Sequence, residues 1–231
     1  DHGGQPDELQ PLAAVRGVDR QVGLDDEGLE PLEGGEDYFI LMPGEMPASG
    51  FYGAKIVGLH PGNPAQGRPA VQGFVMLFDR ASGAPLALMA GAEITAIRTA
   101  AASALATRVL ARPRARSHGI FGAGVQAASH LQAVGLARDI EDVFVWARNA
   151  DKARAFAQQH SNPAGMKVTA VGDPARAGGC DVVSLVTNSP EPVLRGKWLK
   201  PGAHLNLVGA HEPEHREADS DTVARASIYV D

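Results

Sequence analysis

Two sets of residues in this sequence could do chemistry, and the first is a glycine-rich turn that could bind phosphate groups. The stretch HGIFGAGVQAASH, residues 118–130, places Gly122, Gly124 and Ala127 between an apolar run and a predicted helix. This spacing allows a tight turn, close approach of a pyrophosphate to the backbone, and close helix–sheet packing. The N–H groups at the helix start would then face the phosphates. The turn therefore predicts a dinucleotide site, with a purely structural strand-turn-helix as the alternative.

The end of the next predicted strand indicates which dinucleotide binds. An acid there bonds the ribose 2′-hydroxyl of NAD, whereas a cation accommodates the 2′-phosphate of NADP. In VFVWARNADKARAF no acid occurs before Asp151, and Arg148 and Asn149 stand at that place. NADP(H) is favoured over NAD(H), the alternative being that Arg148 is only a solvated surface residue. The predicted cofactor-binding residues are Gly122, Gly124, Val125, Gln126, Ala127, Arg148, Asn149 and Thr187.

The second set consists of two cations in apolar settings. Lys55 lies in the predicted strand YGAKIVG, and Arg98 lies in the predicted helix ITAIRTAA. Such side chains are rarely buried without an anionic partner. Facing one cleft, they would bind a carboxylate, with Arg as a bidentate donor and Lys as a point charge. Taken alone, each is an ordinary salt-bridged residue.

The elements that must position these residues change character along the chain. Residues 38–90 consist of strand-like runs separated by Gly and Pro, which predicts an antiparallel sheet. An Ala-rich helix follows and stops at Pro113. Its larger apolar residues recur at helical spacing: Ile94, Ile97, Ala101, Leu105 and Val109. Beyond it, strands alternate with helices up to a last predicted strand, ASIYV, which predicts a doubly wound parallel sheet of the Rossmann type.

This organisation predicts three regions and an α/β protein. They are an acidic lead-in over 1–37, a smaller antiparallel substrate-binding and dimerisation domain over 38–112, and a Rossmann dinucleotide-binding domain over 113–231. The lead-in carries 11 acids against two arginines, a net charge of −9 within the −6 of the chain. Because the remainder offers no basic stripe or aromatic platform, we expect no nucleic-acid partner.

Neither a membrane nor a metal is expected. The chain has no apolar run of spanning length and no signal-like start, and its single cysteine, Cys180, suits a reducing compartment and a core position. A cytoplasmic location is therefore predicted. The stretch HEPEH, residues 211–215, matches the zinc-protease pattern H-E-x-x-H, but Pro213 argues against the continuous helix which that pattern requires.

Several long stretches resemble the ornithine cyclodeaminase and mu-crystallin family over about residues 38 to 231. They are YFILMPGEMPASGFYGAKIVGLHPGNPAQGRPAVQGFVMLFD, ASGAPLALMAGAEITAIRTAAASALA, GIFGAGVQA and NLVGAHEPEHRE. The resemblance implies a homodimer built through the antiparallel domain and an imino or amino acid substrate. It also implies hydride transfer between nicotinamide and the carbon alpha to a carboxylate. By this resemblance, Lys55 and Arg98 match the family's active-site cations.

One position favours a branch of that family. Cyclodeaminases of the family carry an Asp after VGG or VGA, and here His211 stands at that place. Together with Arg148 and Asn149 at the cofactor ribose, this favours an NADPH-dependent reductase of a cyclic ketimine carboxylate, Δ1-pyrroline-2-carboxylate or Δ1-piperideine-2-carboxylate. His211 would donate or relay a proton, or else only cap the turn. The alternatives are an ornithine cyclodeaminase or another amino-acid dehydrogenase, and a non-catalytic NADPH-binding protein.

The sequence also departs from the family's pattern. Residues 1–37 do not resemble the family's first helix and strand, and an arginine expected before YFILMP has no clear counterpart. Ala90 replaces an Asp that usually precedes the glycine, and the chain ends at IYVD where relatives continue into a segment that packs on the first domain. These departures bear on activity more than on fold.

Overall fold

The computed structural model describes residues 29–31, 37–161, 165–210 and 214–230. Contacts between Cα atoms divide the chain into two compact units, Asp1–Ile94 and Thr95–Asp231. The division lies near the start of the long helix, whereas the sequence predicts a boundary at its end, near residue 112. The helix groups with the second unit because its buried face bonds there, as in the contact of Asn206 with Thr107. The functions assigned to the regions stay predictions.

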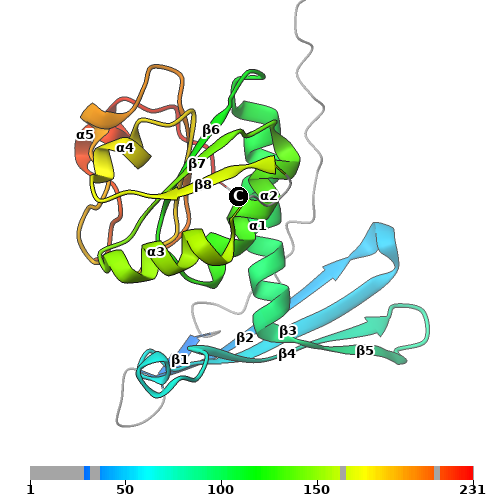
Figure 1. The fold of residues 1–231 in the computed structure, drawn as a ribbon. Helices are drawn as coiled ribbons and strands as arrows, with labels where there is room; N and C mark the ends of the chain where they lie inside the picture. The colour runs from blue at the N-terminus through cyan, green and yellow to red at the C-terminus, as the bar shows by residue number, and fades with distance from the viewer. Residues whose placement is uncertain (1–28, 32–36, 162–164, 211–213, 231) are drawn as a thin grey trace, which may run out of the picture. The chain divides into compact units, whose positions relative to one another are not determined.

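The first unit contains an antiparallel sheet of five strands in chain order (Figure 1). The strands are β1 (Leu29–Pro31), β2 (Tyr38–Met46), β3 (Phe51–Leu59), β4 (Val71–Asp79) and β5 (Pro85–Ala90). Each strand pairs with its neighbour in sequence because the connections are short. The predicted antiparallel sheet is confirmed; β1 was not predicted.

One side of this sheet is apolar and open. Residues in register across β2 to β5, and alternate residues along each strand, share a face. That face, here called the apolar sheet face, carries Phe39, Leu41, Ile56, Phe74, Met76 and Leu88. Among the described residues Leu88 is 69% exposed and Phe39 is 42% exposed. The sheet therefore leaves large apolar side chains uncovered on this side.

The second unit is a parallel sheet in the order β10-β9-β6-β7-β8 (Figure 1). The strands are β6 (Ser117–Phe121), β7 (Asp142–Trp146), β8 (Lys167–Ala170), β9 (Val182–Leu185) and β10 (His204–Leu207). The chain begins in the middle at β6, runs outward to β8, and then crosses back to β9 on the other side of β6. The strand order reverses between β6 and β9, and this switch point is where such sheets bind ligands, beyond the carboxyl ends of the strands.

Helices cover both faces of the parallel sheet, which is why its strands are apolar runs. Ile120 and Phe121, consecutive on β6, point to opposite faces. Ile120 belongs to a buried cluster with Leu131 of α2 and Phe156 of α3, whereas Phe121 packs in a second cluster with Ala177 of α4. The helices are α1 (Gly91–Leu110), α2 (Val125–Ala137), α3 (Ala150–Gln159), α4 (Pro174–Gly178) and α5 (Ser220–Ala224). The predicted doubly wound α/β fold is confirmed.

Some sequence predictions about these elements are confirmed and others are wrong. Cys180 is 1% exposed in the second cluster, as expected of a core residue. Helix α1 forms as predicted, but it buries small residues such as Ala100 and Thr107 and leaves Leu105 62% exposed. Residues 226–230 pair with no strand in the described part of the chain, and Tyr229 is 69% exposed, so the predicted strand there is wrong. None of the described helices is both long and apolar enough to cross a membrane.

Candidate active site

The glycine turn follows β6 directly beside the switch point. Gly122 has a φ of 118°, and a Cβ atom there would lie 2.8 Å from the carbonyl oxygen of Val186, just after β9. Only glycine fits this close approach between strand ends. Nothing lies within 4 Å of the place where a Cβ of Gly124 would be, and Ala127 is fully buried in the first turn of α2. The turn is thus tight at one glycine and open at the other.

The start of α2 presents unpaired polar groups to this opening. Gly124 is the N-cap residue, and a glycine has no side chain with which to cap the first turn of the helix. The first N–H groups of a helix have no partner within it, so those after Gly124 can bind an anion. Val125 is 71% exposed, and the buried Oε1 atom of Gln126 has no hydrogen-bond partner among the described residues. These features fit the phosphates of a dinucleotide.

The two polar residues after β7 have different roles. Asn149 caps α3, because its side chain accepts hydrogen bonds from the backbone N–H groups of Asp151 (2.9 Å) and Lys152 (3.2 Å). Arg148 is exposed and forms no ion pair within the described part of the chain. The side chain of Arg148 is therefore available to a ligand at this edge, whereas that of Asn149 is committed to the helix.

A buried carboxylate that the sequence did not predict joins the ends of β9 and β10. Glu217 is 2% exposed. Its Oε1 atom accepts from the backbone N–H and the hydroxyl of Thr187, both at 2.6 Å, and its Oε2 atom accepts from the N–H of Gly209 at 2.6 Å. In the stretch EPEHREAD nothing in type or spacing distinguishes this acid from Glu214, so only the fold reveals it.

Arg98 lies toward the same edge of the second unit as the glycine turn. It is exposed on α1 and lines a groove that Val208, just after β10, also lines. Two residues beyond the end of the helix, Arg112 forms a 3.1 Å ion pair with Asp181, which precedes β9. The helix therefore runs from the carboxyl edge of the sheet toward its amino edge, with Arg98 at the carboxyl end.

Lys55 lies in the first unit, in the middle of β3. It is half-buried and in register with Met42 on β2 and Val75 on β4. Alternation places it on the side of the sheet opposite the apolar sheet face, together with the buried Val57. The joint carboxylate site of Lys55 and Arg98 stays a prediction. His211 and the HEPEH motif that it begins cannot be assessed, because residues 211–213 lie outside the described residues.

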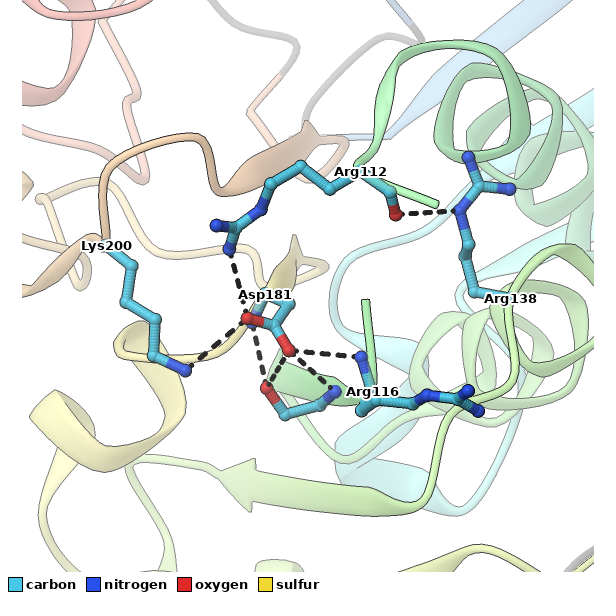
Figure 2. A network of polar contacts seen from close by, with 6 residues as sticks. Arg112, Arg116, Arg138, Asp181 and Lys200 are labelled. Carbon is cyan, nitrogen blue, oxygen red and sulfur yellow. Dashed lines mark hydrogen bonds and ion pairs between the residues drawn. The ribbon is translucent and has the colours of Figure 1, made fainter. Parts of the chain in front are cut away.

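A second carboxylate network lies at the opposite, amino edge of the parallel sheet (Figure 2). Asp181 accepts from the backbone N–H groups of Arg116 and Ser117, both at 3.1 Å, and contacts Arg112 and Lys200. Burial opposes ionisation, but the N–H of Arg116, the Ser117 hydroxyl and the charge of Lys200 outweigh it and hold the pKa of Asp181 below its usual value. This network ties strand starts together far from the glycine turn.

Comparison with known proteins relates this chain to one family. A sequence model of the ornithine cyclodeaminase/mu-crystallin family matches residues 29–231. The chain is 39% identical over 191 residues to the ketimine reductase mu-crystallin of Rattus norvegicus, covering 83% of this chain and 60% of that protein. It is 40% identical over 182 residues to a Δ1-pyrroline-2-carboxylate reductase of Paracoccus denitrificans, covering 78% of this chain and 57% of that protein.

Solved structures agree with these sequence matches. The structure of Thermococcus litoralis Δ1-pyrroline-2-carboxylate reductase in complex with NADH and L-proline superposes with a TM-score of 0.79 at 37% identity, covering 86% of this chain and 62% of that one. An archaeal alanine dehydrogenase dimer with bound NAD gives a TM-score of 0.78 at 31% identity, again covering 86% and 62%. The chain thus spans about three fifths of the length of these relatives.

Proposed function

Since this chain belongs to the ornithine cyclodeaminase/mu-crystallin family, we propose that it uses a reduced nicotinamide dinucleotide to reduce a cyclic ketimine carboxylate. The substrate class is Δ1-pyrroline-2-carboxylate or Δ1-piperideine-2-carboxylate, and the product is the cyclic amino acid. NADPH is the proposed cofactor. Relatives named for this reduction and a solved relative holding NADH and L-proline support the proposal.

The proposal rests chiefly on the backbone geometry at the switch point between β6 and β9. Gly122 closes the turn where the backbones of β6 and β9 nearly touch, while Gly124 leaves open space before an uncapped helix start. A pyrophosphate needs this combination of close backbone approach and unpaired N–H groups. Because a dinucleotide bound there would run along the carboxyl edge, Arg148 is the proposed partner of its 2′-phosphate.

Lys55, Arg98 and His211 supply the substrate groups in this proposal. The chemistry that a bound reduced nicotinamide supplies is hydride donation to the carbon of the C=N bond. Lys55 and Arg98 bind and orient the carboxylate, since an arginine offers two parallel donors and a lysine a compact charge. His211 keeps the imine nitrogen protonated or passes a proton to it through water, as imidazole titrates near neutral pH.

The decisive experiment is oxidation of NADPH and of NADH by the purified protein with Δ1-pyrroline-2-carboxylate. We expect faster turnover with NADPH. Lys55→Ala and Arg98→Ala should each lower kcat/KM by about a hundredfold or more, the loss typical of a charged substrate clamp. Both variants should still bind NADPH. Lys167→Ala is the matched control, since this exposed lysine is the first residue of β8, at the amino edge, and belongs to neither the proposed cofactor site nor the proposed substrate site.

Other outcomes separate the alternatives. Proline and ammonia formed from ornithine would show a cyclodeaminase despite His211. NADPH binding without turnover of either substrate would show a non-catalytic binding protein, the alternative to which the replacement at Ala90 points.

A further inference from the structure

Glu217 is a buried acid for which the proposed chemistry has no use, yet it makes three short hydrogen bonds at the carboxyl edge. Its carboxylate accepts three hydrogen bonds of 2.6 Å, from the N–H and hydroxyl of Thr187 and the N–H of Gly209. Its own backbone oxygen accepts from the N–H groups of Val193 and Leu194. Hydrogen bonds to an ionised group are short and strong, so the carboxylate fixes the segments that follow β9 and β10 relative to one another.

The backbone is tightly packed around the clamp, the name used here for Glu217 with its donors Thr187 and Gly209. A Cβ atom on Gly209 would lie 1.8 Å from the carbonyl oxygen of Thr187 and 2.7 Å from Oε2 of Glu217. Thr187 is also an acceptor, because its hydroxyl oxygen receives the N–H of Ser189 at 3.2 Å. One residue earlier, Val186 donates its N–H to the oxygen of Phe121 at the glycine turn. A displacement of Thr187 would therefore also displace the glycine turn.

The position of the clamp in the sheet indicates which part of a dinucleotide it serves. A doubly wound sheet consists of two mononucleotide-binding halves, and the ribose that selects NAD or NADP lies over the end of the second strand of the first half. That strand is β7, so the adenosine end belongs over β6 and β7. The nicotinamide end then belongs on the other side of the switch point, over β9 and β10, whose ends Glu217 joins.

We propose that Glu217 is a positioning residue for the nicotinamide half of the cofactor site. It acts through Thr187 and Gly209 and does not itself touch the cofactor. The inference depends on the proposed function only in requiring a dinucleotide at the carboxyl edge. It does not depend on which imine is reduced.

The chain contains a matched control. Asp181, like Glu217, is a carboxylate that binds two backbone N–H groups and a hydroxyl, but it does so at the amino edge of the same sheet (Figure 2). Removing either charge loosens the same sheet. Only Glu217 should alter the place where nicotinamide binds.

The test compares NADPH with 2′-phospho-ADP-ribose, which lacks only the nicotinamide, by isothermal titration calorimetry of the full chain. In Glu217→Gln an amide N–H faces a donor, and one hydrogen bond to a charged group is lost. We expect about tenfold weaker binding of NADPH. Binding of 2′-phospho-ADP-ribose should stay within about twofold. Asp181→Asn should leave both affinities unchanged while lowering the melting temperature.

Equal weakening of both ligands by Glu217→Gln would overturn the proposal, because it would show a general loss of structure. Unchanged NADPH binding would overturn it as well. If Glu217→Gln does not fold, Thr187→Val removes a single donor from the clamp and should show the same selective loss. A wild-type chain that binds NADPH but reduces no ketimine contradicts only the proposed reaction, whereas a chain that binds neither ligand contradicts both.

Discussion

At the scale of single residues, the proposed preference for NADP over NAD depends on one side chain. Arg148 and Asn149 are consecutive after β7, but their side chains have different roles in the structure. The amide of Asn149 is occupied by the N–H groups of Asp151 and Lys152, so it is a helix cap first. Arg148 is exposed with no competing carboxylate within the described part of the chain. It is the residue left for a 2′-phosphate.

Replacing Arg148 by Ala should therefore change cofactor preference and little else. We expect NADPH affinity to fall about tenfold or more, since a guanidinium–phosphate pair is a strong charge-assisted contact, with NADH affinity unchanged. Fluorescence titration of both reduced cofactors measures the ratio. Arg154→Ala is the control, because that guanidinium already pairs with Asp151 in the same helix. A parallel loss of NADH binding would show that Arg148 supports the loop and does not select the cofactor.

At the scale of elements, a buried chain of polar side chains joins α1 and α2 to the parallel sheet. His118 of β6 contacts Ser184 of β9 through Nε2 at 2.9 Å. Asn206 of β10 donates to Thr107 of α1 at 3.2 Å. His130 of α2 contacts Ser103 of α1 at 2.9 Å. His118 and His130 are fully buried. Burial, assisted by the charge of His130, lowers the pKa of His118 to about 3, and burial also lowers the pKa of His130.

These two imidazoles should make folding sensitive to acid. A group whose pKa is lower in the folded protein than in the unfolded chain, near 6.5, is protonated preferentially in the unfolded chain between the two values. Stability is therefore complete above pH 6.5 and falls as the pH drops toward 3. The slope from His118 reaches about 1.4 kcal/mol per pH unit, and His130 adds to it in the same direction. Urea unfolding at pH 7, 6, 5 and 4 measures this slope.

His118→Gln should flatten that dependence, although it lowers stability at pH 7 by removing a packed ring. His160→Gln is the control, because His160 lies at the end of α3, outside this polar chain. An unchanged slope in His118→Gln would show that the acid sensitivity arises elsewhere, for example from His204, whose pKa is also lowered by burial.

The sequence predicts those elements whose form has a local cause, and it does not predict features that depend on packing against segments distant in sequence. Strands β6, β7, β9 and β10 were predicted because both faces are covered and the residues are continuously apolar. The glycine turn was predicted because its spacing has a local cause. The exposed stripe of α1 and the clamp of Glu217 were not predicted, because which helix face is buried and which acid meets Thr187 depend on segments distant in sequence. The strand predicted at 226–230 has apolar residues but no neighbouring edge in the described structure.

At the scale of the whole molecule, the apolar sheet face is the proposed contact between two copies of the chain. Large apolar side chains stay exposed there, among them Leu88 at 69% and Phe39 at 42%, and contiguous exposed apolar surface of this kind marks an interaction site. The family resemblance predicts a homodimer through this unit, and the similar archaeal alanine dehydrogenase was solved as a dimer. A sheet face repeated on two copies can pack on itself around a twofold axis.

Leu88→Asp should therefore convert a homodimer into a monomer. A carboxylate buried within an apolar interface has no partner when two copies meet, and its desolvation costs several kcal/mol per copy, enough to dissociate an ordinary dimer. Light scattering after gel filtration should give about twice the 24.1 kDa chain mass for the wild type and the chain mass for the variant. Met42→Asp is the control, because Met42 is 46% exposed on the opposite side of the same sheet, in register with Lys55. Both variants add one charge to the same sheet, so monomers from both would indicate that the charge disrupts the sheet itself. Dissociation of Leu88→Asp alone would identify the apolar sheet face as the contact between copies.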